Sequence, residues 1–173
     1  RILSNCNYKN EDKKMEKNLY QKSITNTIYV KLASKNEILE IKQYLLDFDD
    51  DYFIEISRTA RTIELERLSQ ILKQYLPKKV EGMIDVGANI GLVTLLMEQY
   101  VNSSNILSIE PDQTAYKLLE RNCISNHLTP IIRNCAAGEK RGNMHFSTGK
   151  LSTSGSHIVT KDHIVNYSPL KGG

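Results

Sequence analysis

The chain has 173 residues, which suits one domain with room for a small addition. Hydrophobic residues make up 40% and charged residues 25%, as in ordinary folded proteins. A net charge of +3, with no lysine or arginine run longer than a pair, argues against a nucleic-acid-binding surface. No apolar run approaches the roughly 18 residues of a membrane span, and no apolar signal core follows Arg1. We therefore expect no membrane partner and a chain that lacks its native start.

Three cysteines, Cys6, Cys123 and Cys135, cannot all pair within one chain. Neither they nor the four histidines show the spacing of zinc ligands. We expect free thiols in a reducing cytoplasm and no metal site.

The N-terminal part of the chain changes character at about residue 20. Residues 1–20 are rich in Asn, Lys and Glu without an apolar period, which predicts a loosely attached arm. Residues 23–32 carry Ile24, Ile28 and Val30 among threonines and a tyrosine, which predicts a short strand or hairpin.

A helix is predicted over residues 35–46. Ser34 and Glu37 form a capping-box pattern, in which each side chain bonds the other residue's backbone N–H. Apolar residues follow at helical spacing: Ile38, Ile41, Leu45 and Phe48. The acidic run "DFDDD" at 47–51 lacks the glycine turn and terminal glutamate of a calcium loop, which favours a solvated acidic turn.

A second amphipathic helix is predicted over residues 63–76, ended by Pro77. Its apolar stripe is Leu65, Leu68, Ile71, Leu72 and Tyr75. Each of the two helices needs a surface against which to bury one face. Residues 1–78 are therefore predicted to be an N-terminal arm and helical segment that packs on the domain that follows.

From residue 80 onward, predicted strands and helices alternate. The strands are 80–86, 105–111 and 129–137, and the helices between them are 90–101 and 112–126. Such alternation with short loops predicts an α/β fold with a Rossmann-like, doubly wound parallel sheet and right-handed crossovers.

The first turn of that sheet, "MIDVGANIGLVTLL" at 83–96, is the predicted ligand site. In such sheets ligands bind beyond the carboxyl ends of the strands, where the chain turns into a helix. Gly87 permits a tight turn, and Gly91 permits close packing of the helix against a ligand or strand. The N–H groups at the start of the helix suit a carboxylate or phosphate.

Two acids indicate the kind of ligand. Asp85 would repel a pyrophosphate but can pair with an ammonium group, and Asn89 stands where a dinucleotide motif has its middle glycine. Glu110 ends the second strand, where a carboxylate can accept hydrogen bonds from both hydroxyls of a ribose. A ligand with an amino-acid end and a ribose is S-adenosylmethionine.

The pieces "IDVGANIGLVTLL", "SIEPD", "LLERNCISN" and "IIRNCAAGEKRGNMHF", in this order and spacing, resemble the FkbM family of S-adenosylmethionine-dependent methyltransferases. The resemblance covers roughly residues 80–150. It implies a class I Rossmann-like methyltransferase fold, with residues 79–173 as the cofactor-binding domain. It also implies methyl transfer to oxygen on a small metabolite or sugar hydroxyl as acceptor.

The resemblance also implies cofactor contacts. The methionine end would lie against the first loop, made of Asp85, Gly87, Ala88, Asn89 and Gly91. The ribose and adenine would lie against the second and third strand ends, made of Glu110, Pro111, Asp112, Cys135 and Ala136. Structural roles remain open beside these: Asp112 serves equally as a helix N-cap, the glycines as plain turn residues, and Cys135 as a small buried residue.

The family continues beyond the extra strand at 142–148 with a strand ending in a "D-x-E-G"-like motif, which this chain lacks before Gly173. We therefore expect a sheet that is incomplete at the C-terminus, and no catalytic residue is assigned. Candidate bases, each more typical of an ordinary surface residue, are His145, His157, Asp162 and His163. Residues 147–156 are a candidate loop that closes over the acceptor.

Two other functions stay open. A nicotinamide-dependent oxidoreductase uses a similar sheet, but Asp85 and the missing middle glycine argue against it. A catalytically incomplete, methyltransferase-like binding module is the other alternative, because half a sheet leaves an unpaired edge.

Overall fold

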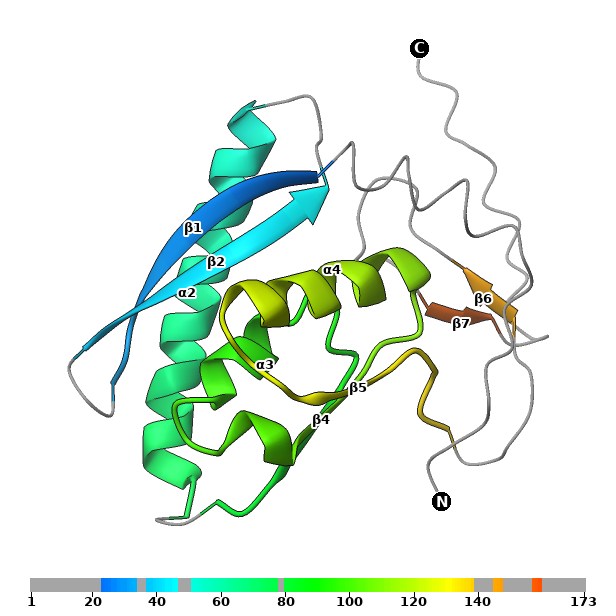
Figure 1. Ribbon diagram of the computed structural model, residues 1–173. Coiled ribbons are helices and arrows are strands. Elements are labelled where there is room, and N and C mark those ends of the chain that lie inside the picture. Colours follow the sequence, from blue (N-terminus) through cyan, green and yellow to red (C-terminus); the bar gives the residue numbers. More distant parts are fainter. Residues whose placement is uncertain are drawn as a thin grey trace.

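The computed structural model describes residues 23–33, 37–46, 51–77, 80–138, 145–147 and 157–159. Its elements in chain order are β1 (Ser23–Lys31), β2 (Ile38–Leu46), α2 (Asp51–Tyr75), β3 (Met83–Val86), α3 (Leu92–Met97), the 3₁₀ turn η1 (Ser103–Asn105), β4 (Ile106–Ile109), α4 (Gln113–Ser125), β5 (Ile131–Arg133), β6 (His145–Ser147) and β7 (His157–Val159) (Figure 1). The predicted arm at 1–20 lies outside the described residues.

The predicted parallel α/β sheet is confirmed as three strands in the order β3-β4-β5, with α3 and α4 as the connecting helices. The register places Asp85 beside Ser108, and Ser108 beside Ile132. Each strand is shorter than its predicted range, and α3 is much shorter than the predicted helix 90–101. The arrangement is compatible with a Rossmann-like sheet.

The helix predicted at 35–46 was wrong, because residues Ile38–Leu46 form strand β2 and pair antiparallel with β1 along its whole length. Glu37, whose side chain was expected to cap a helix, lies at the turn of the hairpin, where its backbone carbonyl accepts the N–H of Leu32 at 2.8 Å. Burial in β2 alternates as in a strand, since Ile41 and Gln43 are buried while Lys42 between them is exposed. Pairing with β1, which local reasoning cannot detect, decided between the two periods.

Helix α2 contains the predicted helix 63–76 except for Leu76, and it begins twelve residues earlier, at Asp51. Asp51, the last residue of the predicted "DFDDD" turn, therefore belongs to the helix, and the first four residues of that turn lie outside the described part of the chain. The predicted apolar stripe is only partly buried: Leu65 is in the core, whereas Ile71 and Tyr75 are 52% and 73% exposed.

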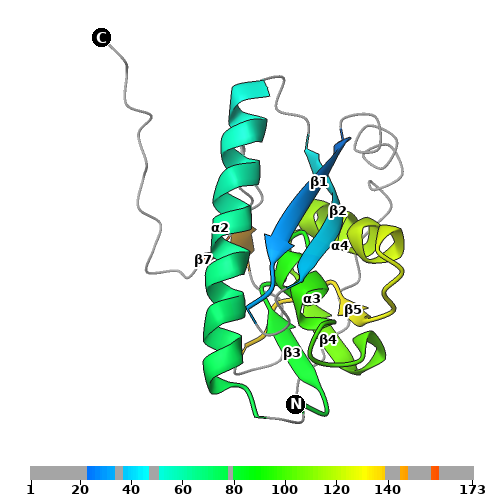
Figure 2. The same cartoon turned by 90° about the vertical axis from the view of Figure 1, so that its left-hand side faces the viewer.

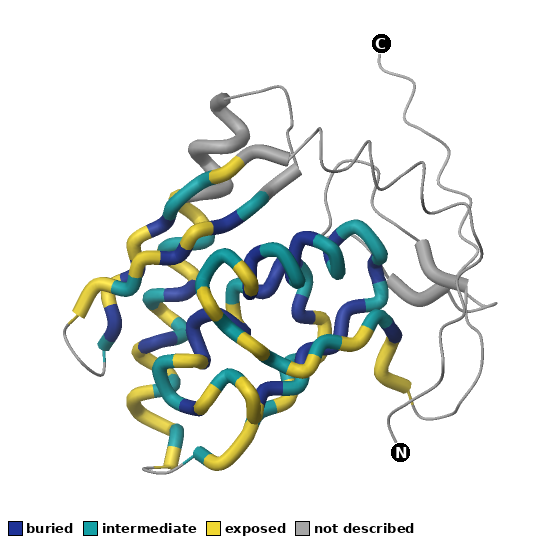
Figure 3. Tube along the Cα trace, viewed as in Figure 1, coloured by how far each residue is buried: buried dark blue, intermediate teal, exposed yellow. Residues whose placement is uncertain are grey.

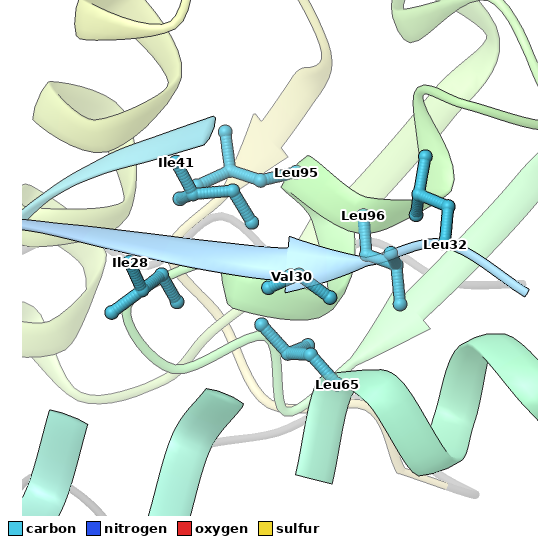
Figure 4. Close-up of a cluster of buried hydrophobic side chains, with 7 residues drawn as sticks. All are labelled: Ile28, Val30, Leu32, Ile41, Leu65, Leu95 and Leu96. Atoms are coloured by element: carbon cyan, nitrogen blue, oxygen red, sulfur yellow. The ribbon is translucent and has the colours of Figure 1, made fainter. Parts of the chain in front are cut away.

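The largest core cluster lies where the β1–β2 hairpin meets helices α2 and α3. Its buried members are Ile28, Val30, Leu32, Ile41, Leu65, Leu95 and Leu96 (Figure 4). Figure 2 shows the hairpin between α2 on one side and α3 and α4 on the other, and buried positions recur along the hairpin, α3 and α4 in Figure 3. This cluster joins residues from both sides of residue 78 and so packs the hairpin and α2 against α3, the helix that follows the loop after β3.

Strands β6 and β7 form a two-stranded antiparallel pair, and β6 lies within the extra strand predicted at 142–148. Among the helices that the structure describes, none is long and apolar enough to cross a membrane.

Candidate functional site

The loop between β3 and α3 has three of its five residues in the left-handed region of backbone conformation. These are Gly87 (φ 79°), Asn89 (φ 49°) and Gly91 (φ 91°). The backbone N–H groups of Gly87 and Ala88 both donate to the carbonyl of Ile109, at 2.9 and 3.1 Å. The loop is therefore held by hydrogen bonds across the carboxyl end of the neighbouring strand β4.

Glu110 connects the first two strand ends through both of its carboxylate oxygens. Its Oε2 accepts the backbone N–H of Asn89 at 2.7 Å, and its Oε1 accepts that of Asp112 at 2.7 Å. Each oxygen keeps a further lone pair with which it can accept a hydroxyl. The side chain is only 5% exposed, so its carboxylate has a fixed orientation before a ligand arrives.

Asp85 points to the helix side of the sheet, where it meets two hydroxyl groups. Thr94 Oγ1 donates to Asp85 Oδ2 at 2.6 Å and lies 2.8 Å from Ser108 Oγ. With the Thr94 proton committed to Asp85, the Ser108 hydroxyl donates to Thr94, which makes a chain from strand β4 through α3 to the acid. Thr94 and Ser108 are completely buried, so this chain orients Asp85.

Burial raises the pKa of both acids. For Asp85 the loss of hydration outweighs the hydrogen bonds from Thr94, which act in the opposite direction. For Glu110 burial again dominates over the two backbone hydrogen bonds, and the charges of Asp112 and Asp85 raise the pKa further. The negative charge of Asp85 thus disfavours ionisation of Glu110.

The two loop glycines serve different purposes. A Cβ built on Gly87 meets no heavy atom within 4 Å, so space lies open beside this exposed residue. A Cβ on Gly91 would lie 2.5 Å from Cδ1 of Leu119. Gly91 therefore allows α4 to pack closely on the loop, a partner that the sequence did not identify, and only Gly87 borders free space.

Asn89 carries a polar atom without a partner at the centre of the loop. Its Oδ1 is buried and accepts no hydrogen bond from the residues that the structure describes. A buried acceptor of this kind costs about 1–3 kcal/mol unless something donates to it. An unpaired acceptor, open space beside Gly87 and two acids on adjacent strand ends together fit a ligand that carries N–H and O–H donors.

The other residues predicted to contact the cofactor differ in their structural role and in their exposure. Asp112 takes the N-cap role that was left open, because its Oδ1 accepts the N–H groups of Thr114 and Ala115 at 2.8 and 2.9 Å. Ala88 and Cys135 are buried, and Ala88 packs with Leu119. Pro111 is half-buried and Ala136 exposed.

Sequence reasoning missed four residues that support this site: Thr94, Ser108, Asn122 and Asn134. Asn134 donates from Nδ2 to the carbonyls of Glu110 (2.8 Å) and Pro111 (3.2 Å), which holds the end of β4. For Ser108, the sequence feature that could have indicated this role is a polar residue inside an otherwise apolar strand, "ILSIE".

Of the four candidate bases, two are described by their backbone alone and two lie outside the described residues. The backbones of His145 and His157 lie in β6 and β7, whereas Asp162, His163 and most of the candidate closing loop lie outside the described residues. Cys123 and Cys135 are buried, and burial together with the charges of Asp85 and Glu120 raises the pKa of the Cys123 thiol to about 12. In the described ranges, no three His, Cys, Asp or Glu side chains gather to hold a metal ion.

Compared with known proteins, the chain matches no family model, and no curated protein matches it.

Proposed function

We propose that the chain binds S-adenosylmethionine across the ends of β3 and β4 and acts in methyl transfer to a small-molecule hydroxyl, as its resemblance to the FkbM family implies. The observation that carries the proposal is the pair of carboxylates, Asp85 and Glu110, on the ends of adjacent parallel strands with a left-handed loop between them.

The ligand's chemistry matches this pair in charge and hydrogen-bonding groups. Asp85 attracts a cationic amino group, and the unused lone pairs of Glu110 accept ribose hydroxyls. A nicotinamide dinucleotide would instead bring a pyrophosphate toward Asp85, which costs electrostatic energy. The acids therefore favour an amino-acid nucleoside over a dinucleotide.

The bound cofactor would supply a methyl group that its sulfonium already activates. The residues of the chain then have three tasks: to hold the cofactor, to orient it and to exclude competing ligands. Thr94 and Ser108 fix the direction of Asp85, while the N–H groups of Asn89 and Asp112 fix that of Glu110.

Isothermal titration of the chain with S-adenosylmethionine and, separately, with NAD tests the proposal. We expect saturable one-site binding of S-adenosylmethionine and no measurable binding of NAD. The opposite preference would replace the proposal with the oxidoreductase alternative. No binding of either would leave a methyltransferase-like module without a cofactor.

A further inference from the structure

The outer edge of strand β2 is paired with a helix instead of a strand. Asn126, the C-cap residue of α4, accepts the backbone N–H of Lys42 at its Oδ1 (3.0 Å) and donates from Nδ2 to the Lys42 carbonyl (2.6 Å). One turn earlier, Asn122 Oδ1 accepts the backbone N–H of Tyr44. Two side-chain amides thus take the place of a neighbouring strand.

The spacing of the two asparagines explains why they reach the strand in register. Four residues of α-helix rise about 6 Å. Two residues of β-strand rise about 6.7 Å. Asn122 and Asn126 therefore face Tyr44 and Lys42, which present their backbone groups to the same edge. The guanidinium of Arg121 also lies 3.7 Å from the centroid of the Tyr44 ring, which adds a contact at the same junction.

Asn122 has a second task that Asn126 lacks. Its Nδ2 donates to the carbonyl of Ile90, at 2.7 Å, in the loop between β3 and α3. The side chain is completely buried, so bulk water does not compete for these hydrogen bonds. A single amide therefore joins the hairpin edge, helix α4 and the candidate ligand loop.

We propose that Asn122 is a positioning residue, which holds the loop Gly87–Gly91 in its ligand-binding geometry through the Ile90 carbonyl and couples that loop to the hairpin. The carbonyl lies between Asn89, whose N–H meets Glu110, and Gly91, whose N–H donates to Ala88. Fixing Ile90 limits the backbone rotation of both neighbours. The role in ligand binding rests on the proposed function, whereas the role in loop geometry does not.

Matched aspartate variants separate positioning from general stability. Asn122→Asp keeps the acceptor for the Tyr44 N–H but loses the donor to the Ile90 carbonyl and the longer bond to the Tyr44 carbonyl, at 3.4 Å. Asn126→Asp keeps the acceptor for the Lys42 N–H and loses the donor to the carbonyls of Lys42 and Asn122, neither of which belongs to the loop. Amide hydrogen exchange, corrected for each variant's global stability, is measured at Asn89 and Gly91, together with the dissociation constant for S-adenosylmethionine.

We expect exchange at Asn89 and Gly91 to accelerate by about tenfold in Asn122→Asp, as for one lost buried hydrogen bond, and to stay at the wild-type rate in Asn126→Asp. The affinity for S-adenosylmethionine should fall in the first variant alone.

Equal exchange rates at Asn89 and Gly91 in the two variants would overturn the positioning role. Wild-type chain that binds no S-adenosylmethionine, with selective exchange in Asn122→Asp, would reject the proposed function and support the positioning role. If Asn122→Asp does not fold, Asn122→Ser and Asn126→Ser provide a second matched pair. A serine hydroxyl ends one bond short of the amide's outer atoms, so both variants lose their bonds to the hairpin and only Asn122→Ser also loses the bond to Ile90.

Discussion

At the scale of single residues, a buried partner fixes the orientation of the Asp85 carboxylate, while desolvation disfavours its charged form. The Thr94 hydroxyl directs its carboxylate, while burial raises its pKa above the ordinary 3.8. The folded state therefore holds the proton more tightly than the unfolded state. That contribution to stability is fully present below pH 3.8 and is lost as the pH rises through the raised pKa. Glu110, whose pKa is also raised, acts in the same direction.

Asp85→Asn tests this conflict between stability and binding. The asparagine oxygen can still accept the Thr94 hydroxyl, but the charge is gone. We expect thermal unfolding at pH 7 to move to a higher temperature than in wild type, with the difference vanishing at acid pH. Affinity for S-adenosylmethionine should fall by about 1.5–3 kcal/mol, the range for a hydrogen bond to a charged group. A variant less stable at pH 7 but with unchanged affinity would show that Asp85 has only a structural role.

The loop glycines allow a comparison within five residues of chain. Both have positive φ, so alanine strains the backbone at either position by about 1 kcal/mol. Only Gly91→Ala also drives a Cβ into Leu119. We expect urea unfolding to show a loss of about 2–4 kcal/mol for Gly91→Ala, with the clash added to the strain. Gly87→Ala should lose only the strain and yet weaken cofactor binding, because its Cβ enters the open space. Equal losses of stability would remove this distinction.

At the scale of elements, the sequence was sufficient where strands and helices alternate and insufficient where pairing is non-local. Residues 80–137 carry short apolar strands between turn residues. All three strands and both helices were predicted there from the sequence, although the predicted ranges are longer than the elements in the structure. Residues 35–46 fit both a helical and a strand period, so β1, the partner, had to be known before the strand could be chosen. The support of Asp85 by Ser108 likewise required the register between β3 and β4.

The junction of hairpin, α2 and α3 depends on Leu65, which lies among the side chains of both strands and of α3. We expect Leu65→Ala to lower the free energy of unfolding by about 2–5 kcal/mol, as for other buried leucines. Ile71→Ala, on the exposed face of the same helix, should cost less than about 0.5 kcal/mol and serves as the control. Chemical denaturation followed by circular dichroism measures both. Similar losses for the two variants would mean that α2 does not pack on the hairpin as described.

At the scale of the whole molecule, the hairpin, the helices and the parallel sheet converge on one loop. The N-terminal elements are fastened to it through Asn122, and the two strand ends are fastened through Glu110. The predicted division at residue 78 does not separate the core, since Leu65 and Leu95 share a cluster. Binding of a ligand at the loop should therefore change the environment of hairpin residues, most directly that of the Tyr44 amide, which bonds Asn122.

The most direct test of the proposed site is a two-dimensional NMR titration of the isotope-labelled chain with S-adenosylmethionine. The account predicts that the largest amide shifts fall at Asp85–Gly91 and Glu110–Asp112, with a smaller shift at Tyr44. Asp85→Asn should greatly reduce all of them. Shifts that are absent, or that concentrate elsewhere while these amides stay unchanged, would contradict the assignment of a cofactor site to the ends of β3 and β4.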